Sequence, residues 1–328
     1  MIEADGQRIY TMSELMRYLE CPKLYEWSYG ERLRRTNSMA LPLNVGSAVH
    51  FGIERMLMGS RSALDEALAM YAAETGPHWA MAEEYGKTWQ DLVKGREQIK
   101  GCLATYPWTA EDFNGIESTE EAFIVEMGAQ RCYAGKWDRV VKLPDGRLYI
   151  HDTKTTGERL DFVIQKHRMR MQYKAYCYAY WKIHGTKPAG FIMDFIVKPR
   201  VNFKKDGSLS SISDTTFHRE PMVMRQCDYD YFPQWFERVV DGIERDTAAT
   251  MFPQNSEACG NWNRLCSYYD LCRAGSSRME AAIKDSLFDV ESDIHGSEYI
   301  TEASLQAAAW RRRVEEDAAA VAREEADA

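Results

Sequence analysis

The feature that most constrains the fold is a predicted β-hairpin centred on Pro144-Asp145-Gly146. Apolar residues alternate with polar ones on both sides of this turn-forming tripeptide, and a period of two is typical of strands. We expect the first strand to end near Leu143 and the second to run from Arg147 to Lys154. The rest of the chain is organised around this hairpin.

The hairpin is expected to bring three charged side chains together. Asp138 lies on the first strand, and Asp152 and Lys154 share one face of the second because side chains on a strand repeat every two residues. Carboxylate oxygens suit Mg²⁺ or Mn²⁺, and a nearby lysine can hold a water molecule or stabilise charge on a phosphate. The combination indicates phosphodiester chemistry. Taken alone, the same residues also fit a strand cap and a solvated sheet edge.

The following segment adds a second pair of polar residues. From Asp161 to about His184 the chain contains no proline or glycine, which predicts one long helix. Gln172 and Tyr176 are four residues apart, so they share a face of this helix just downstream of the hairpin.

The ordered set Gly135-x-x-Asp138, Asp152-x-Lys154 and Gln172-x-x-x-Tyr176 resembles the motifs of the PD-(D/E)XK nucleases. The similarity is to the RecB-type branch, which includes AddB-like and CRISPR-associated exonucleases, and it extends over residues 13–275. It implies an α/β fold with a mixed central sheet flanked by helices, the restriction-endonuclease-like core. It also implies a metal-dependent DNA nuclease.

The resemblance assigns metal-binding roles to several residues. Asp138 and Asp152 would bind Mg²⁺ or Mn²⁺ with help from the Thr153 carbonyl, and Lys154 would orient the attacking water. A helix expected to begin at Gly46-Ser47-Ala48-Val49-His50, after a loop over Leu41–Val45, matches a Gly-x-x-x-His helix that supplies an imidazole to the metal in RecB-type nucleases. His50 is therefore a candidate ligand, and a structural histidine is the alternative.

The net charge of -9 conceals an uneven distribution. Residues 159–205 contain 11 Lys or Arg against two acidic residues, and a basic segment beside a carboxylate site suits the phosphate backbone of DNA. We expect Gln172 and Tyr176 to position the strand and four basic residues of the same helix to hold its backbone. The four are Lys166, Arg168, Arg170 and Lys174. A solvated helix face is the alternative.

Three late cysteines form the only cysteine cluster, Cys259-x6-Cys266-x5-Cys272. In a chain without an export signal, clustered cysteines favour metal binding over disulfides. The resemblance to AddB-like enzymes adds Cys21 as the fourth ligand, at an exposed helix break before Pro22, and implies a 4Fe-4S cluster that staples the two ends of the domain. The family's usual spacing between the second and third cysteines is shorter than the six residues that separate Cys259 from Cys266 here. A zinc site and unliganded thiols are the alternatives to an iron-sulfur cluster.

We divide the chain at residue 278. Residues 1–278 would form the nuclease domain, with a helical insertion over about 61–115 and a strand over Glu120–Glu126 ahead of the hairpin. A glutamate upstream of the hairpin, Glu117 or preferably Glu121, could add an acidic group to the site. Residues 279–328 contain 13 acidic residues against five basic ones and would form an acidic extension, helical over 301–326 or flexible. The extension could dock on a protein partner or cover the basic groove.

No apolar run reaches the roughly 18 residues of a membrane span, and the amino terminus, with Glu3 and Asp5, is unlike a signal peptide. We therefore expect a cytoplasmic DNA nuclease, an exonuclease of DNA processing, recombination or repair. One alternative is a DNA-binding or assembly subunit of a recombination or CRISPR-adaptation-like complex, although pure binding needs no cluster of like charges. Another is an iron-sulfur redox protein, for which the hairpin and its lysine have no purpose.

Overall fold

The computed structural model describes the chain except for residues 1–2, 5–6, 37–40, 109–114, 262–263 and 293–328. Within the described residues, a seven-stranded sheet has the order β1-β2-β5-β6-β7-β10, with β4 also pairing to β5. Its strands are β1 (Glu3–Ala4), β2 (Gln7–Thr11), β4 (Ile116–Glu126), β5 (Arg131–Lys142), β6 (Leu148–Thr156), β7 (Gly190–Val197) and β10 (Thr216–Val223). The β2·β5 and β6·β7 pairs are parallel and the others antiparallel, which confirms the predicted α/β class with a mixed sheet.

The predicted hairpin is confirmed as β5 and β6. Gly146 takes a positive φ of 83°, which glycine adopts without strain, and its N–H donates to the Leu143 carbonyl at 2.8 Å. Backbone pairing runs from Lys142↔Leu148 to Arg139↔His151 and goes no further. Asp138 and Asp152 lie beyond that pair, where the backbone ladder between β5 and β6 has ended.

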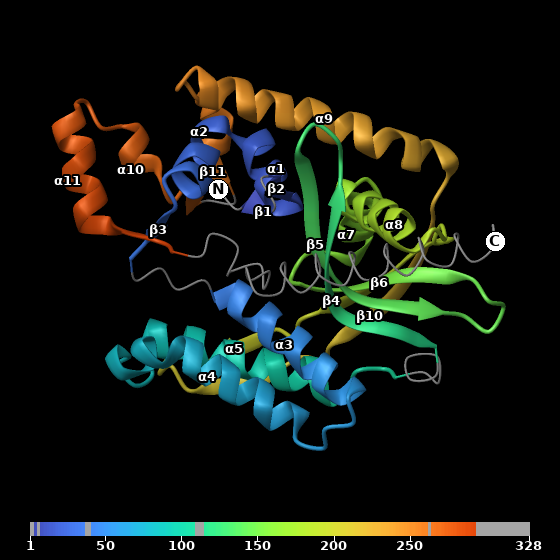
Figure 1. The fold of residues 1–328 in the computed structure, drawn as a ribbon. Coiled ribbons are helices and arrows are strands. Elements are labelled where there is room, and N and C mark those ends of the chain that lie inside the picture. Colours follow the sequence, from blue (N-terminus) through green and yellow to red (C-terminus); the bar gives the residue numbers. More distant parts are fainter. Residues whose placement is uncertain (1–2, 5–6, 37–40, 109–114, 262–263, 293–328) are drawn as a thin grey trace.

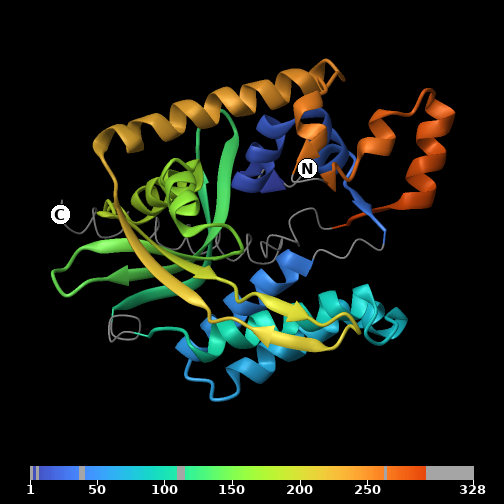
Figure 2. The same cartoon turned by 180° about the vertical axis from the view of Figure 1, so that it is seen from behind.

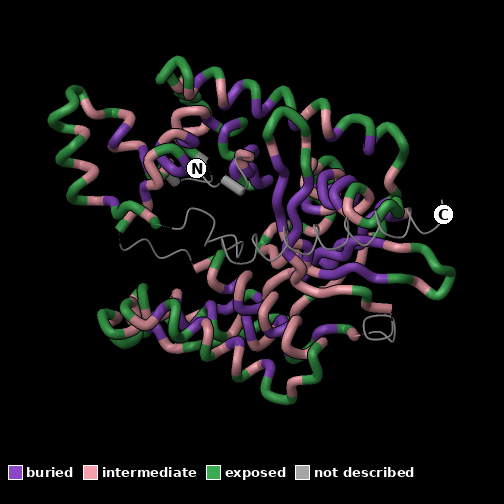
Figure 3. Tube along the Cα trace, in the orientation of Figure 1, coloured by how far each residue is buried: buried purple, intermediate pink, exposed green. Residues whose placement is uncertain are grey.

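Helices cover both faces of the sheet (Figure 1). One face packs against α8 (Met171–His184), α9 (Gln226–Ala248) and α1 (Met12–Glu20), with an aromatic core that includes Phe123, Trp137 and Phe236. The other face carries α3 (Leu41–Leu57), α4 (Ala63–Met81) and α5 (Lys87–Ala104), whose own core includes Val49 and reaches Ile196 of β7. Figure 3 shows the buried residues concentrated in the sheet and the helix faces against it. None of the described helices has the length and apolar character that a bilayer span requires.

The predicted single helix over 161–184 is wrong, because the structure divides it into α7 (Leu160–Arg168) and α8. Val163 and His167 of α7 are buried, and an unbroken helix would continue that stripe through positions 170, 171 and 174. The buried residues of α8 are instead Tyr173 and Tyr176 with their neighbours. A break at 169–170 allows both stripes to face the core.

The loop predicted over Leu41–Val45 is also wrong, since α3 already begins at Leu41. Pro42 is tolerated there because the first turn of a helix has no N–H bond to lose. Of the additional residues, Val45 is buried and Leu41 partly buried in the core that α3 shares with α4 and α5, the two helices of the predicted insertion.

Segments from the two ends of the described chain lie side by side. Strand β3 (Leu33–Arg35) pairs antiparallel with β13 (Phe288–Val290). Leu33 and Phe288 of this pair share a hydrophobic cluster with Cys21 and Leu271. A hairpin of β8 (Val201–Phe203) and β9 (Leu209–Ile212) lies along α5 (Figure 2). The remaining elements are α2 (Pro22–Tyr25), η1 (Glu26–Gly30), η2 (Ser256–Cys259), β11 (Gly260–Asn261), β12 (Arg264–Leu265), α10 (Tyr269–Cys272) and α11 (Ser277–Leu287). The helix predicted over 301–326 falls outside the described residues.

Candidate active site

The hairpin brings its three charged residues to one place. Lys154 Nζ lies 2.9 Å from Oδ2 of Asp152 and 3.2 Å from Oδ1. The backbone N–H of Thr153 donates to Asp138 Oδ2 at 2.8 Å across the gap where the strands are no longer paired. Asp152 is only 1% exposed, so its charge is balanced inside the protein and not by bulk water.

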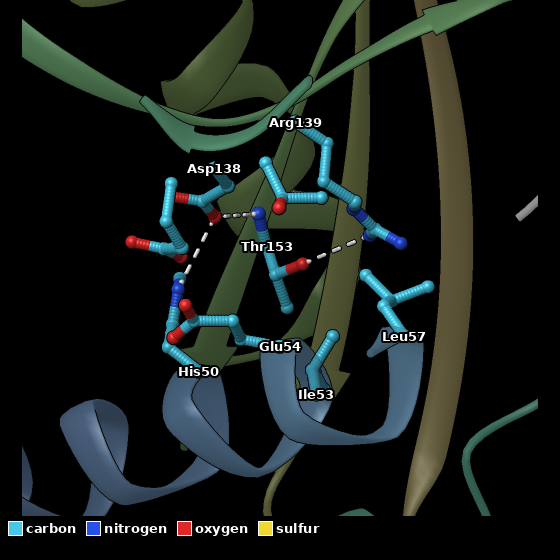
Figure 4. Close-up of a pocket in the computed structure, with 9 residues that line it drawn as sticks. His50, Ile53, Glu54, Leu57, Asp138, Arg139 and Thr153 are labelled. Atoms are coloured by element: carbon cyan, nitrogen blue, oxygen red, sulfur yellow. Dashed lines mark hydrogen bonds and ion pairs between the residues drawn. The ribbon is translucent and has the colours of Figure 1, made fainter. Parts of the chain in front are cut away.

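His50 reaches the same site from α3. A Cβ at Gly46, one turn earlier, would make ordinary van der Waals contact with Thr155 Oγ1 at 3.4 Å, so this part of α3 lies against β6. His50 Nδ1 lies 3.2 Å from Asp138 Oδ2. Figure 4 shows the two side chains pointing toward one another.

Glu120 joins the site in place of the glutamates proposed from sequence. The ligand atoms of Glu120, His50 and Asp138 all lie within 4.8 Å of one another, and Glu120 also pairs with Lys136. The preferred candidate, Glu121, is paired in register with Trp137 and lies with Glu117 near Tyr180 of α8. Glu120 has a positive φ of 46°, an irregularity of β4 that the sequence pattern does not reveal.

The acidic groups of the site perturb one another. Burial raises the pKa of Asp152 to about 6, and although Lys154 opposes that rise, the charge of Asp138 adds to it. Burial would also raise the pKa of Asp138, but His50 and Lys154 outweigh it and hold this pKa well below its usual range. Burial and Asp138 raise the pKa of Glu120. Asp138 therefore opposes ionisation of both Asp152 and Glu120, and a bound cation would relieve that repulsion.

These donors fit a divalent cation. Carboxylate oxygens are the ligands that Mg²⁺ and Mn²⁺ prefer. Among the described residues, no group donates a well-aligned hydrogen bond to the buried Asp152 Oδ2, although Lys154 lies close to it. A buried carboxylate oxygen that lacks such a donor is a natural position for a metal ligand.

Gln172 and Tyr176 lie at the same cavity, and the Gln172 side-chain amide donates to the Tyr176 hydroxyl at 2.9 Å. The glycine of the first motif has a packing role, because a Cβ at Gly135 would lie 2.5 Å from Phe123 Cζ and 3.3 Å from Tyr176 Cε1. Without a side chain there, the Phe123 and Tyr176 rings can pack edge to face beneath the site.

The cavity in front of these residues has a volume of about 610 Å³. Its walls include Met12 and Met16 of α1 and Phe51 of α3. Arg170, at the start of α8, also lines it.

The other three basic residues predicted to bind DNA have carboxylate partners. Lys166 pairs with Glu158 at 3.2 Å, Arg168 pairs with Glu220, and Lys174 pairs with Asp228 at 2.8 Å. Within that predicted set of four, the structure therefore places only Arg170 at the cavity.

The cysteines near the two ends of the domain meet in a separate cluster. Asn255 N–H donates to Cys21 Sγ at 3.3 Å, and Trp27 Nε1 donates to Cys272 Sγ at 3.4 Å. Burial raises the pKa values of the Cys266 and Cys272 thiols, and the neighbouring cysteines raise them further. The expectation that Cys21 is exposed is wrong: it is 7% exposed, because Leu24, Trp27 and residues of α10 pack around it.

The four sulfurs do not form a group as compact as that of His50, Glu120 and Asp138. Among the residues that the structure describes, the group with His, Cys, Asp or Glu ligand atoms all within 4.8 Å is His50, Glu120 and Asp138 alone. No three of the sulfurs of Cys21, Cys259, Cys266 and Cys272 therefore lie that close together.

Comparison with known proteins gives one family. The family model of the PD-(D/E)XK nuclease superfamily matches residues 10–273. A solved structure of a presumed exonuclease from Eubacterium rectale is 15% identical with a TM-score of 0.47, and the match covers 83% of this chain and 91% of that chain. A second structure, SSO0001, is 12% identical with a TM-score of 0.30 over 78% of this chain and 80% of that chain. No curated protein matches the sequence.

Proposed function

The chain belongs to the PD-(D/E)XK nuclease superfamily, and we propose that it is a Mg²⁺- or Mn²⁺-dependent deoxyribonuclease that works as an exonuclease in DNA processing, recombination or repair. The observation that carries the proposal is the convergence of Asp138, Asp152 and Lys154 on one cavity with His50 and Glu120. Membership of the superfamily makes the chain a phosphodiester hydrolase. The DNA substrate, the metal and the exonucleolytic mode are parts of the proposal.

The carboxylates would hold the metal. Asp138 and Asp152 would supply oxygens, Glu120 and His50 would complete the protein ligands, and the Thr153 carbonyl stays a predicted ligand. A divalent ion bound there would activate water and neutralise charge that develops on the phosphate. The repulsion that Asp138 exerts on Asp152 and Glu120 supports this arrangement, because a bound cation would relieve it.

The other residues would handle the DNA. Lys154 would orient the attacking water and stabilise the phosphate, Gln172 and Tyr176 would position the strand, and Arg170 would contact its backbone. In-line attack of water on phosphorus would break the bond to the 3′ oxygen, which takes up a proton. The products would be a 5′-phosphate and a 3′-hydroxyl.

We propose that Cys21, Cys259, Cys266 and Cys272 hold a 4Fe-4S cluster, as in the RecB-type branch. The electrostatic influence of Cys21, Cys259 and Cys272 on the Cys266 thiol supports a shared ligand set. Four thiolates can also form a closed zinc site, and zinc is the alternative. The cluster would tie the segment after α1 to the segment before α11, which are far apart in the sequence.

A DNA-binding or assembly subunit with secondary cleavage is the second candidate. The 13 acidic residues of 279–328 favour it, because an acidic extension suits docking on a basic protein partner. The complete Asp-Asp-Lys set favours the nuclease, since binding alone does not require buried carboxylates that repel one another.

The test is incubation of the protein with end-labelled single-stranded and duplex DNA in Mg²⁺, Mn²⁺ or a chelator. We expect metal-dependent cleavage with mononucleotides or short products from the earliest times. Asp152→Asn should bind DNA nearly as well as the wild type, because the basic residues remain, but should not cleave it. Full cleavage by a clean Asp152→Asn preparation would reject the site.

A further inference from the structure

A group of charged side chains is buried beside the candidate active site and has no part in the proposed reaction. Arg139 is 2% exposed, His151 1% and Asp194 5%. They come from the neighbouring strands β5, β6 and β7. Burial of charge is costly unless it is paired, so three such residues at one place need a physical reason.

Asp194 is the centre of this buried network. Arg219 of β10 donates from Nε to Asp194 Oδ1 at 2.6 Å and from Nη2 to Oδ2 at 2.8 Å. His151 Nε2 lies 2.9 Å from Oδ2, and the Tyr106 hydroxyl donates to the same oxygen. Arg139 Nη2 lies 3.5 Å from it and 3.0 Å from His151 Nε2. The network thus links four adjacent strands of the sheet.

Thr153 joins the network to the metal-binding carboxylates. Arg139 Nη2 donates to Thr153 Oγ1 at 3.3 Å, and the Thr153 N–H donates to Asp138 Oδ2 at 2.8 Å (Figure 4). The backbone ladder between β5 and β6 ends at Arg139↔His151, so these contacts continue the connection past its last pair. Arg139 directly follows Asp138, and Thr153 lies between Asp152 and Lys154.

We propose that Arg139 and Asp194 are positioning residues, which act through Thr153 to fix the separation of Asp138 and Asp152. The inference rests on the proposed metal-dependent nuclease. Where the ladder between β5 and β6 has ended, β4 and β7 still pair with the outer edges of these strands, but no backbone pair sets the distance between the two carboxylates directly. A misplacement of about 1 Å costs on the order of 100-fold in rate. Asp194 holds Arg139 in place directly, at 3.5 Å, and through His151 and Tyr106, which contact both residues. Arg139 in turn holds Thr153 against β5.

A network that only stabilises the sheet is the competing explanation, and a matched control separates the two. Asp246 of α9 is buried to the same degree, at 6% exposed. It accepts a hydrogen bond from the Tyr18 hydroxyl at 2.7 Å and pairs with Arg245 at 2.9 Å. Asp246→Asn therefore removes a comparable buried charge between α1 and α9, outside the proposed network.

The experiment compares Asp194→Asn, Thr153→Val and Asp246→Asn with the wild type. Mn²⁺ affinity is measured by calorimetry without DNA, kcat and KM are measured on labelled DNA, and the melting temperature is measured in chelator. We expect Asp194→Asn and Thr153→Val to lower Mn²⁺ affinity and kcat by about 10- to 100-fold with KM unchanged. Asp246→Asn should lower the melting temperature and leave Mn²⁺ affinity and kcat unchanged.

Wild-type Mn²⁺ affinity in folded Asp194→Asn would overturn the proposal, and so would an equal loss of affinity in Asp246→Asn. If Asp194→Asn does not fold, Thr153→Val decides by the same criteria, because it exchanges one hydroxyl for a methyl group and keeps the backbone N–H. If the wild type binds Mn²⁺ but cleaves no DNA, the proposed function fails, and the calorimetric comparison alone decides on the positioning role.

Discussion

Replacing Asp152 with asparagine should make the metal-free protein more stable while it removes activity. Burial raises the pKa of Asp152 to about 6, against the attraction of Lys154 and with a further contribution from Asp138. An acid whose pKa is raised by folding binds its proton more tightly in the folded state, so its ionised form destabilises the fold. The destabilisation is small below about pH 4, grows as the pH rises towards 6, and is complete above that.

The magnitude follows from the same pKa. A pKa that rises from its usual 3.8 to about 6 corresponds to about 3 kcal/mol of lost stability for the ionised group. Asparagine resembles the protonated acid, so Asp152→Asn should gain about 3 kcal/mol near pH 8, or about 5 °C in melting temperature for a chain of this size. Near pH 5 the gain should fall to about half, because Asp152 of the wild type is then mostly protonated in the folded state and mostly ionised in the unfolded state.

Thermal unfolding in chelator, followed by circular dichroism across this pH range, measures the effect. Added Mn²⁺ should then raise the melting temperature of the wild type and leave that of Asp152→Asn unchanged, because ligand binding stabilises only the protein that holds the ligand. A variant that is no more stable near pH 8, or equally stabilised at all pH values, would refute the reasoning about burial of this charge.

Three further predictions follow from the packing and the ligand sets. Glu120→Gln should lower the rate of DNA cleavage at least about 10-fold, and Glu121→Gln should leave that rate unchanged, because of these two glutamates only Glu120 lies with His50 and Asp138. Equal effects of the two variants in a cleavage assay would contradict this. Gly135→Ala should lower the free energy of unfolding by about 1 to 3 kcal/mol in chemical denaturation, since the new Cβ would lie 2.5 Å from a Phe123 carbon atom; unchanged stability would show that the ring moves freely. Cys21→Ala should lower the iron content, the sulfide content and the melting temperature together in anaerobic preparations. Stoichiometric zinc in a colourless wild type would mean that the cysteines bind zinc and not iron. A metal-free wild type, with a Cys21→Ala variant of unchanged stability, would rule out the cluster.

The sequence predicted the parts of the site that depend on local patterns. Asp138, Asp152 and Lys154 were expected together because a turn of Pro144-Asp145-Gly146 sets the pairing of the two strands directly. Glu120 was missed because its place depends on the register of β4 against β5 and on its positive φ. The loop between those strands contains no comparable turn signal, and Glu121 has the same chemistry one residue away.

Long-range packing explains the other differences. Nothing in the composition of residues 161–184 breaks a helix, and the break at 169–170 arises from which residues meet the core. Cys21 is buried because a segment more than two hundred residues later covers it. The contact between Arg139 and Asp194 spans 55 residues along the chain, and no local pattern relates the two.

The most direct test of the central claim is anomalous diffraction from crystals soaked in Mn²⁺. The account predicts a Mn²⁺ peak about 2.0 to 2.3 Å from carboxylate oxygens of both Asp138 and Asp152, with Lys154 outside the ligand shell and no such peak in Asp152→Asn. A peak that persists in Asp152→Asn, or an active crystal whose Mn²⁺ lies away from both carboxylates, would contradict it.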